Sequence, residues 1–306
     1  MKIRVLGSAA GGGFPQWNCN CRNCSGVRTG KVRALARTQS SIAVCGRERG
    51  TWALVNASPD ILAQLRANPE LQPARAPRDS AIAAIVLVDG QVDHTAGLLM
   101  LRESAAPLPV WCTDNVHADL TGGHPIFGVL GHYCGVERRS ITPDGCEFSV
   151  DGVAGVSWRA LPVPGKPAPY SPHREAPVAG DNVALVLRDA TTRRAAVYAP
   201  GLGEMEPALW QALEQAACVL IDGTFWSDDE MIALGVSRKR ARDIGHLPQS
   251  GRGGMLEWLG RLPAATRRIL IHVNNTNPIL DEDSPQRAEL ARRGIEVAWD
   301  GLEIEL

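Results

Sequence analysis

The chain has 306 residues, of which 44% are hydrophobic, so it can bury a large core. A net charge of −1 at pH 7 and a pI near 6.7 argue against a nucleic-acid partner, and the longest basic cluster, at 238–242, is short enough for a solvated surface. No stretch approaches the roughly eighteen apolar residues of a membrane span, and residues 1–6 are too short for a signal-peptide core, so we expect a soluble, cytoplasmic protein. Because no linker or charge run divides the sequence, we expect a single domain over residues 1–306.

Short apolar strands alternate with helical segments, in a similar order in both halves of the chain. Strands with interspersed helices in two similar halves favour two sheets packed face to face with helices outside. In chain order we predict strands at 3–7, 41–45 and 52–56, a helix at 59–66, a buried strand at 82–88, a helix at 95–102, a hairpin at 182–188 and 195–199, a helix at 204–217, a buried strand at 217–222, a helix at 249–259 and a buried strand at 268–273.

Ionisable residues stand at the ends of several predicted strands. Asp60 follows the third strand, Asp93 and His94 follow the strand at 82–88, and Asp222 and His272 end two later strands. Loops at the ends of buried strands are where sheet folds place their chemistry. One such residue is commonly a turn or a satisfied core group, but several together favour a metal site.

The segment at 89–94, Asp-Gly-Gln-Val-Asp-His, matches the pattern His-x-His-x-Asp-His with Asp89 and Gln91 in place of the two leading histidines. That pattern is the metal motif of the metallo-β-lactamase superfamily, which the chain resembles. The resemblance implies an α+β fold, the αββα sandwich of two mixed β-sheets with helices outside. Asp89 and Gln91 are either hydrogen-bond partners of a substrate or simply the end of a strand.

A closer resemblance, to the coenzyme PQQ synthesis protein B family, extends over nearly the whole chain. It rests on five motifs that are jointly far more distinctive than any one of them. They are Gly-Gly-Gly-Phe-Pro-Gln-Trp-Asn-Cys-Asn-Cys-Arg-Asn-Cys at 11–24, Asp-His-Thr-Ala-Gly-Leu-Leu-Met-Leu-Arg at 93–102, Ile-Asp-Gly-Thr-Phe-Trp at 221–226, Gly-His-Leu-Pro at 245–248 and His-Val-Asn-Asn-Thr-Asn-Pro at 272–278.

Departures from the hydrolase pattern bear on the metal. In dinuclear members of the superfamily the first metal binds the two leading histidines and a later one, and here the later region, 161–166, also has no histidine. The resemblance therefore implies a single metal, held by Asp93, His94 and His272 with Asp222 as a further candidate ligand. Two histidines and one carboxylate are the ligands of non-haem Fe(II) oxygenases, although zinc and manganese also bind such a set.

The resemblance also implies a reaction. The family is associated with PQQ biosynthesis and with an iron- and O₂-dependent hydroxylation of the tyrosine ring in the Glu-Tyr precursor of PQQ. The expected partners are this small precursor, O₂ and other PQQ biosynthesis proteins. Two other functions stay open: a carrier that helps to move PQQ or its precursor toward the periplasm, and a metal-dependent hydrolase, which would need a second metal.

His246 is a further catalytic candidate. It stands at the entry of the helix predicted at 249–259 and resembles the position of a proton-donating histidine in phosphodiesterase relatives. A neutral imidazole there would hydrogen-bond a phenolic oxygen or a bound oxygen species, whereas the alternative is a helix-entry histidine bonded to the backbone. Two long irregular stretches, 121–135 and 162–181, are predicted to form the pocket walls and a lid.

Three cysteines form the strongest metal signal that needs no family knowledge. Cys19, Cys21 and Cys24 lie within six residues, flanked by residues that permit a tight loop. In a reducing compartment this spacing favours a structural Zn(II) knuckle over a redox pair. A structural zinc takes four ligands, and phosphodiesterase relatives have a histidine three residues beyond the counterpart of His272. Asn275 stands there in this chain, so the fourth ligand stays open.

Overall fold

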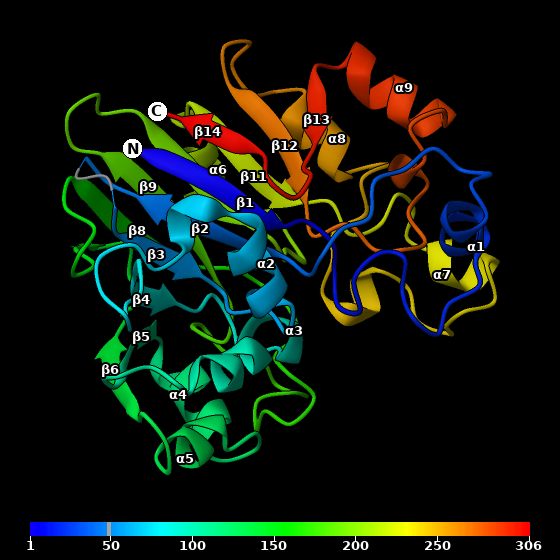
Figure 1. The fold of residues 1–306 in the computed structure, drawn as a ribbon. Helices are drawn as coiled ribbons and strands as arrows, with labels where there is room; N and C mark the ends of the chain where they lie inside the picture. The colour runs from blue at the N-terminus through cyan, green and yellow to red at the C-terminus, as the bar shows by residue number, and fades with distance from the viewer. Residues whose placement is uncertain (48–49) are drawn as a thin grey trace.

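The computed structural model describes residues 1–47 and 50–306, and within them the strands form two seven-stranded sheets (Figure 1). In the first sheet β14, β1, β2 and β3 pair antiparallel, whereas β3, β4, β5 and β6 pair parallel. In spatial order its strands are β14 (Glu303–Glu305), β1 (Lys2–Gly7), β2 (Ser41–Cys45), β3 (Trp52–Val55), β4 (Ile82–Val86), β5 (Leu108–Cys112) and β6 (Val136–Ser140).

The second sheet has the same division into a parallel and an antiparallel part. Here β13, β12, β11 and β10 pair parallel, whereas β10, β9, β8 and β7 pair antiparallel. Both sheets are therefore mixed, as predicted. In spatial order the strands are β13 (Ile295–Val297), β12 (Arg267–Ile271), β11 (Cys218–Asp222), β10 (Ala195–Ala199), β9 (Val183–Asp189), β8 (Val156–Pro162) and β7 (Glu147–Phe148).

The core lies between the two sheets because alternate side chains of each strand point to opposite faces. On β2, Ile42 and Val44 join the apolar cluster between the sheets, whereas Ala43 and Cys45 face the outer layer. Both faces of each strand are thus apolar, which is what a sheet covered on both sides requires.

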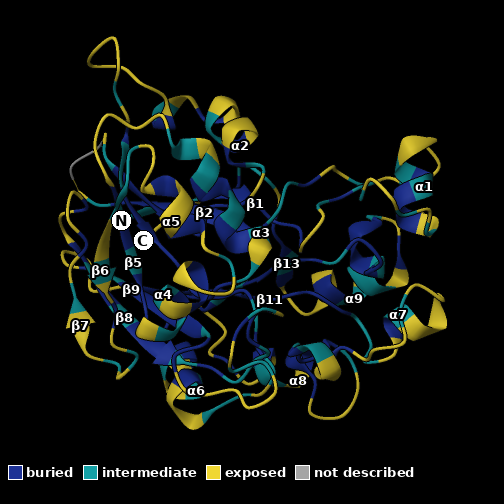
Figure 2. Cartoon of the chain, turned by 90° about the horizontal axis from the view of Figure 1, so that it is seen from below, coloured by how far each residue is buried: buried dark blue, intermediate teal, exposed yellow. Residues whose placement is uncertain are grey.

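Helices cover the two outer faces, and their outward sides are exposed (Figure 2). The resulting order of layers is helix, sheet, sheet, helix, so the predicted αββα sandwich is confirmed. Over the first sheet lie α2 (Ile61–Ala67), α4 (Asp114–Thr121) and α5 (Ile126–Leu130), and over the second lie α6 (Pro207–Glu214), α8 (Met255–Leu259) and α9 (Pro285–Arg292). Further helices at the loop end are α1 (Arg22–Arg28), α3 (Val92–Thr95) and α7 (Glu230–Ala233).

Two predicted helices differ from the structure. The helix expected at 249–259 begins only at Met255, because Gly251 and Gly253 adopt left-handed backbone angles, with φ of 85° and 69°, that interrupt a right-handed helix. The helix expected at 95–102 is instead the end of α3 followed by the 3₁₀ segment Ala96–Leu101. There the N–H of Gly97 donates to the carbonyl of Ala57, 2.9 Å away, so a tertiary contact fixes the turn.

The carboxyl ends of β3, β4, β11 and β12 meet at one end of the sandwich. Residue Ala9, after β1, forms an isolated bridge to Val273, after β12, and Asp89, after β4, forms one to Asn182, before β9. The polar residues at these strand ends are thereby brought to a common place. Among the described residues no helix is long and apolar enough to cross a membrane.

The core makes a direct stability prediction. Trp158 on β8 is fully buried between the sheets, whereas Trp17 is 86% exposed. Trp158→Ala should lower the free energy of unfolding by about 3–5 kcal/mol, because it removes a large apolar side chain and leaves a cavity. Trp17→Ala should change it by less than about 0.5 kcal/mol. Equal losses in urea titrations of the two variants would contradict this assignment of the core.

Candidate metal centre

His94 lies on α3, just after β4, and a hydrogen bond to Asp89 fixes the orientation of its ring. Its Nδ1 is 2.8 and 2.9 Å from the two carboxylate oxygens of Asp89. A carboxylate only accepts, so Nδ1 carries a proton, and in the neutral ring, which is the form that binds a metal, Nε2 keeps its lone pair. That buried Nε2 has no hydrogen-bond partner among the described residues. Burial alone would lower the pKa of His94, but the charges of Asp89 and Asp93 outweigh it and raise that pKa to about 9.

His272 follows β12 in a strained conformation, with φ of 61°, a left-handed angle that is rare for a residue other than glycine. Neighbouring backbone groups hold it there. The N–H of Val273 donates to the carbonyl of Ser8 at 2.9 Å, and the N–H of Ala10 donates to the carbonyl of Val273 at 3.0 Å. Strain sustained in this way is a mark of functional sites.

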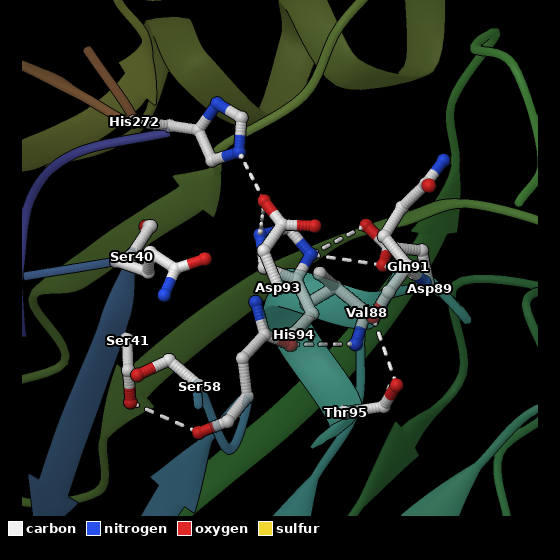
Figure 3. Close-up of polar contacts among 12 residues, drawn as sticks. Ser40, Ser41, Ser58, Val88, Asp89, Gln91, Asp93, His94, Thr95 and His272 are labelled. Atoms are coloured by element: carbon white, nitrogen blue, oxygen red, sulfur yellow. Dashed lines mark hydrogen bonds and ion pairs between the residues drawn. The ribbon is translucent and has the colours of Figure 1, made fainter. Parts of the chain in front are cut away.

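Asp93 completes a cluster with these two imidazoles. Its Oδ2 lies 3.3 Å from Nε2 of His272 and 3.9 Å from Nε2 of His94, and Figure 3 shows its carboxylate directed between the two rings. The three ligand atoms all lie within 4.8 Å of one another. Burial would raise the pKa of Asp93, but the two nearby imidazoles lower it well below its ordinary value.

A second cluster, Asp222, His246 and His272, shares one histidine with the first. Asp222 ends β11, is fully buried and accepts four hydrogen bonds: from the N–H of Leu202 and Nδ1 of His246 on Oδ2, and from the N–H and hydroxyl of Thr224 on Oδ1. Burial lowers the pKa of His246, but the Asp222 carboxylate outweighs it and raises that pKa above its ordinary value.

Thr224 fixes the tautomer of His272. Its hydroxyl is 2.6 Å from Oδ1 of Asp222, which can only accept, so the hydroxyl proton points there. The same oxygen is 2.9 Å from Nδ1 of His272 and therefore accepts the proton of that nitrogen. His94, His246 and His272 thus all have Nδ1 bound to the protein, and each has Nε2 available.

This arrangement suits a metal ion. Imidazole ligands typically donate their second ring N–H to a carboxylate or another acceptor, which fixes the tautomer and orientation. The unpartnered Nε2 of His94, the facing Nε2 of His272 and the charged oxygen of Asp93 form such a donor set for Fe(II), zinc or manganese. Asp222 is grouped with His246 rather than with Asp93 and His94, and its four hydrogen bonds are those of a residue that orients others.

The site differs from the sequence-based prediction at two residues, Asp60 and Thr224. Asp60 lies outside both clusters: its Oδ2 accepts from the backbone N–H and the side-chain amide of Gln39, each at 2.9 Å, which is a structural role. Thr224, which joins the clusters, was missed. It stands two residues after a strand-ending aspartate, and that polar position was the available signal.

The cysteines gather in a third cluster, with the three Sγ atoms within 4.8 Å of one another. The side-chain amide of Asn275 covers them. Its Nδ2 lies 3.4 Å from Sγ of Cys24 and 3.8 Å from Sγ of Cys21, and the amide also contacts Cys19. Burial raises the pKa of Cys21 to about 11. The fourth side chain at this cluster is therefore the asparagine that stands in the position of the relatives' histidine.

A cavity of about 280 Å³ opens above the first two clusters. The stretch 162–181 supplies part of its lining, namely Gly165, Lys166, Pro169 and Arg174, as predicted. The stretch 121–135 supplies none of the described lining residues, so that half of the prediction is wrong. The reason is that His124 packs behind the first stretch, with its ring 5.2 Å from the ring of Tyr170.

Comparison with known proteins first identifies the superfamily to which the chain belongs. The family model for the β-lactamase superfamily domain matches residues 51–273. A diphosphatase of the PhnP family shares the fold, with a TM-score of 0.67 at 18% identity over 100% of this chain and 96% of that one. The fold and the family model together define a β-lactamase superfamily protein.

Relatives with higher sequence identity identify the family within this superfamily. Coenzyme PQQ synthesis protein B of Azoarcus sp. (strain BH72) is 64% identical over 100% of both chains, and that of Cupriavidus necator is 60% identical over 99% of both. The crystal structure of Zn²⁺-bound PqqB from Methylobacterium extorquens superposes with a TM-score of 0.91 at 37% identity, covering 100% of both chains. The chain belongs to the coenzyme PQQ synthesis protein B family.

Glu230, at the start of α7, ties the segment after His272 to the loop after β11. One carboxylate oxygen accepts from the Thr276 hydroxyl at 2.5 Å and the other from the N–H of Trp226 at 2.7 Å. The residue is only 6% exposed, and burial raises its pKa to about 7.

Glu230 therefore makes stability depend on pH. Its carboxyl favours the protonated form in the folded chain, so its contribution is full below about pH 4.5 and is lost as the pH rises through about 7. Relative to Glu230→Gln, the parent should lose about 3 kcal/mol between these values, as the shift converts at about 1.36 kcal/mol per unit. Chemical denaturation across this range measures the difference. A constant difference between the two proteins would contradict the assignment.

Proposed function

We propose that this chain acts in PQQ biosynthesis as an Fe(II)- and O₂-dependent enzyme that hydroxylates the tyrosine ring of the Glu-Tyr precursor. The observation that supports this most is the cluster of Asp93, His94 and His272, whose two Nε2 atoms and one carboxylate face one another. Fe(II) held by these two histidines and one carboxylate would leave positions for O₂ and substrate. One oxygen atom enters the ring and the other leaves as water, with two electrons supplied by an external reductant.

The ligands in this proposal are Asp93, His94 and His272. Asp222 was expected as a further ligand, but its hydrogen bonds favour a role in orienting His246. Asp89, in the place of a lost metal histidine, holds the ring of His94 by accepting its Nδ1–H. The position therefore serves the single metal site indirectly.

His246 is the proton-handling residue of the proposal. Its Nδ1 donates to Asp222 at 2.7 Å, and its ring lines the cavity, so Nε2 is the atom available to a substrate. A neutral Nε2 accepts the phenolic proton of a tyrosine, and the Asp222 carboxylate stabilises the imidazolium that results. Phe225 packs edge-on against the ring at 5.9 Å and restricts its rotation.

A hydrolase is the second candidate, because the two carboxylate–histidine clusters share His272. Hydrolysis by two metals would require both clusters to be occupied. A carrier of PQQ or its precursor is the third candidate and would bind ligand without turnover. Counting the metals in anaerobically purified protein separates the hydrolase from the oxygenase, and turnover separates both from the carrier.

The iron ligands give the first functional prediction. Asp93→Ala and His272→Ala should each abolish iron binding and O₂-dependent hydroxylation, because either change removes a donor atom from a set of three. Iron content by mass spectrometry and product formation with ascorbate as reductant are the measurements. A variant that binds iron and hydroxylates at the parent rate would show that the replaced residue is not an iron ligand.

Asp222→Asn provides the matched comparison. If Asp222 orients His246, this variant keeps iron at about one per chain but turns over at least about tenfold more slowly. His246→Gln should behave in the same way. Loss of iron from a folded Asp222→Asn protein, with its melting temperature measured in parallel, would instead make Asp222 a ligand.

We also propose that Cys19, Cys21 and Cys24 hold a structural Zn(II) with the side-chain oxygen of Asn275 as fourth ligand. A half-turn of the amide places Oδ1 where Nδ2 stands, 3.4 and 3.8 Å from two of the sulfurs. Zn–S and Zn–O bonds of about 2.3 and 2.1 Å in a tetrahedron put ligand atoms roughly 3.5 Å apart, which matches. Such a zinc would brace the segment that carries His272.

Substitutions at this cluster should reduce stability before chemistry. Asn275→Ala should lower zinc affinity measured with a competing chelator, Asn275→His should restore it, and Cys21→Ser should lose the metal and lower the melting temperature. Substitution by cobalt makes the coordination number visible in the absorption spectrum. The assignment of Asn275 is contradicted if Asn275→Ala leaves both the affinity and the cobalt spectrum unchanged.

A further inference from the structure

The cavity above the metal cluster has two chemically different walls. One wall comes from the segment between β8 and β9 and presents the side chains of Lys166, Arg174 and Asn182. The other comes from the segment after β11 and presents three apolar side chains: Phe225, Met231 and Ile244. Asp93, His94, His246 and His272 also line this cavity.

Asp89, Asp93 and Asp222, which line the cavity or hold its histidines, each already have a histidine partner within the protein. Asp89 is bound to His94, Asp93 lies between two imidazoles and Asp222 is bound to His246. Lys166 and Arg174, in contrast, form no ion pair with any residue that the structure describes. The amide nitrogen of Asn182 is buried and likewise lacks a partner within the described chain. This wall therefore offers two positive charges and a hydrogen-bond donor to whatever enters.

The wall is held in place from several sides. The side chain of Gln91, at the position of the second lost metal histidine, donates to the carbonyl of Lys166 at 3.0 Å. Gly245, next to His246, packs so closely on the same residue that a Cβ there would lie 2.5 Å from the backbone nitrogen of Lys166. The guanidinium of Arg174 donates to the carbonyl of Pro167. The backbone segment that bears Lys166 and Arg174 is thus anchored to the loops of the metal site.

We propose that Lys166 and Arg174 form the carboxylate-binding subsite of this cavity and select an acidic aromatic substrate. A ligand with carboxylates at one end and an aromatic ring at the other matches both walls: the carboxylates pair with Lys166 and Arg174, and the ring lies against Met231 and Ile244. This assignment deepens the proposed function and rests on it for the identity of the substrate. It also gives Gln91 a role, as the residue that fixes the position of Lys166.

Binding without turnover tests the subsite. The probes are the dipeptide Glu-Tyr and its uncharged counterpart, Gln-Tyr amide, titrated into the metal-loaded protein by calorimetry in the absence of O₂. The parent should bind Glu-Tyr more tightly, and Lys166→Met and Arg174→Gln should each weaken that binding by about 10- to 100-fold, the range for one hydrogen bond to a charged group. Neither variant should change the binding of Gln-Tyr amide.

Two exposed residues provide matched controls. Lys239→Met and Arg252→Gln remove the same charges from exposed positions outside the cavity lining and should leave the affinity for Glu-Tyr unchanged. The subsite is refuted if the parent binds Glu-Tyr no more tightly than Gln-Tyr amide, or if Lys166→Met and Arg174→Gln weaken both probes equally. Charge-dependent binding in a protein that never hydroxylates would contradict the oxygenase and leave the subsite standing.

Discussion

The Nδ1–H of His94 is held by the carboxylate of Asp89, and the Nδ1–H of His272 is held by the hydroxyl of Thr224. These two hydrogen bonds fix which nitrogen of each ring is free, and the geometry of the site depends on them. With both Nε2 atoms directed toward Asp93, the chain has three donor atoms in one place. Without these hydrogen bonds either ring nitrogen could carry the proton, and the two Nε2 lone pairs would not be preformed as metal ligands.

The same constraint explains how the superfamily motif has been reused. Asp89 and Gln91 stand where two metal-binding histidines are expected, and both now support other residues: Asp89 fixes His94, and Gln91 fixes the backbone of Lys166. His246 and the cationic wall line the same cavity as the cluster of Asp93, His94 and His272. We infer that substrate-binding and proton-handling groups take the place of a second metal in this chain. The strained backbone of His272, after β12, is held by the segment after β1 of the other sheet, so the fold itself maintains the site.

Much of this was predictable from sequence. The apolar runs at 82–88, 217–222 and 268–273 contain the strands β4, β11 and β12, because short, continuous apolar runs are typical of strands that are buried on both faces. The convergence of Asp93, His94 and His272 followed from their places at strand ends. The end of α3 at Thr95, where a helix was expected to continue to residue 102, and the late start of α8 did not, because they depend on tertiary contacts and on glycine conformations. The linking role of Thr224 requires side-chain orientations that no sequence pattern encodes.

We propose that one iron, held by Asp93, His94 and His272, activates O₂ for hydroxylation of a tyrosine ring. Protein purified and loaded with Fe(II) without oxygen, then mixed once with the Glu-Tyr precursor, ascorbate and ¹⁸O₂, tests it most directly. We expect about one iron per chain and a product whose ring carries one labelled oxygen atom. Two metals per chain with no labelled product, or labelled product formed equally by Asp93→Ala, would contradict it.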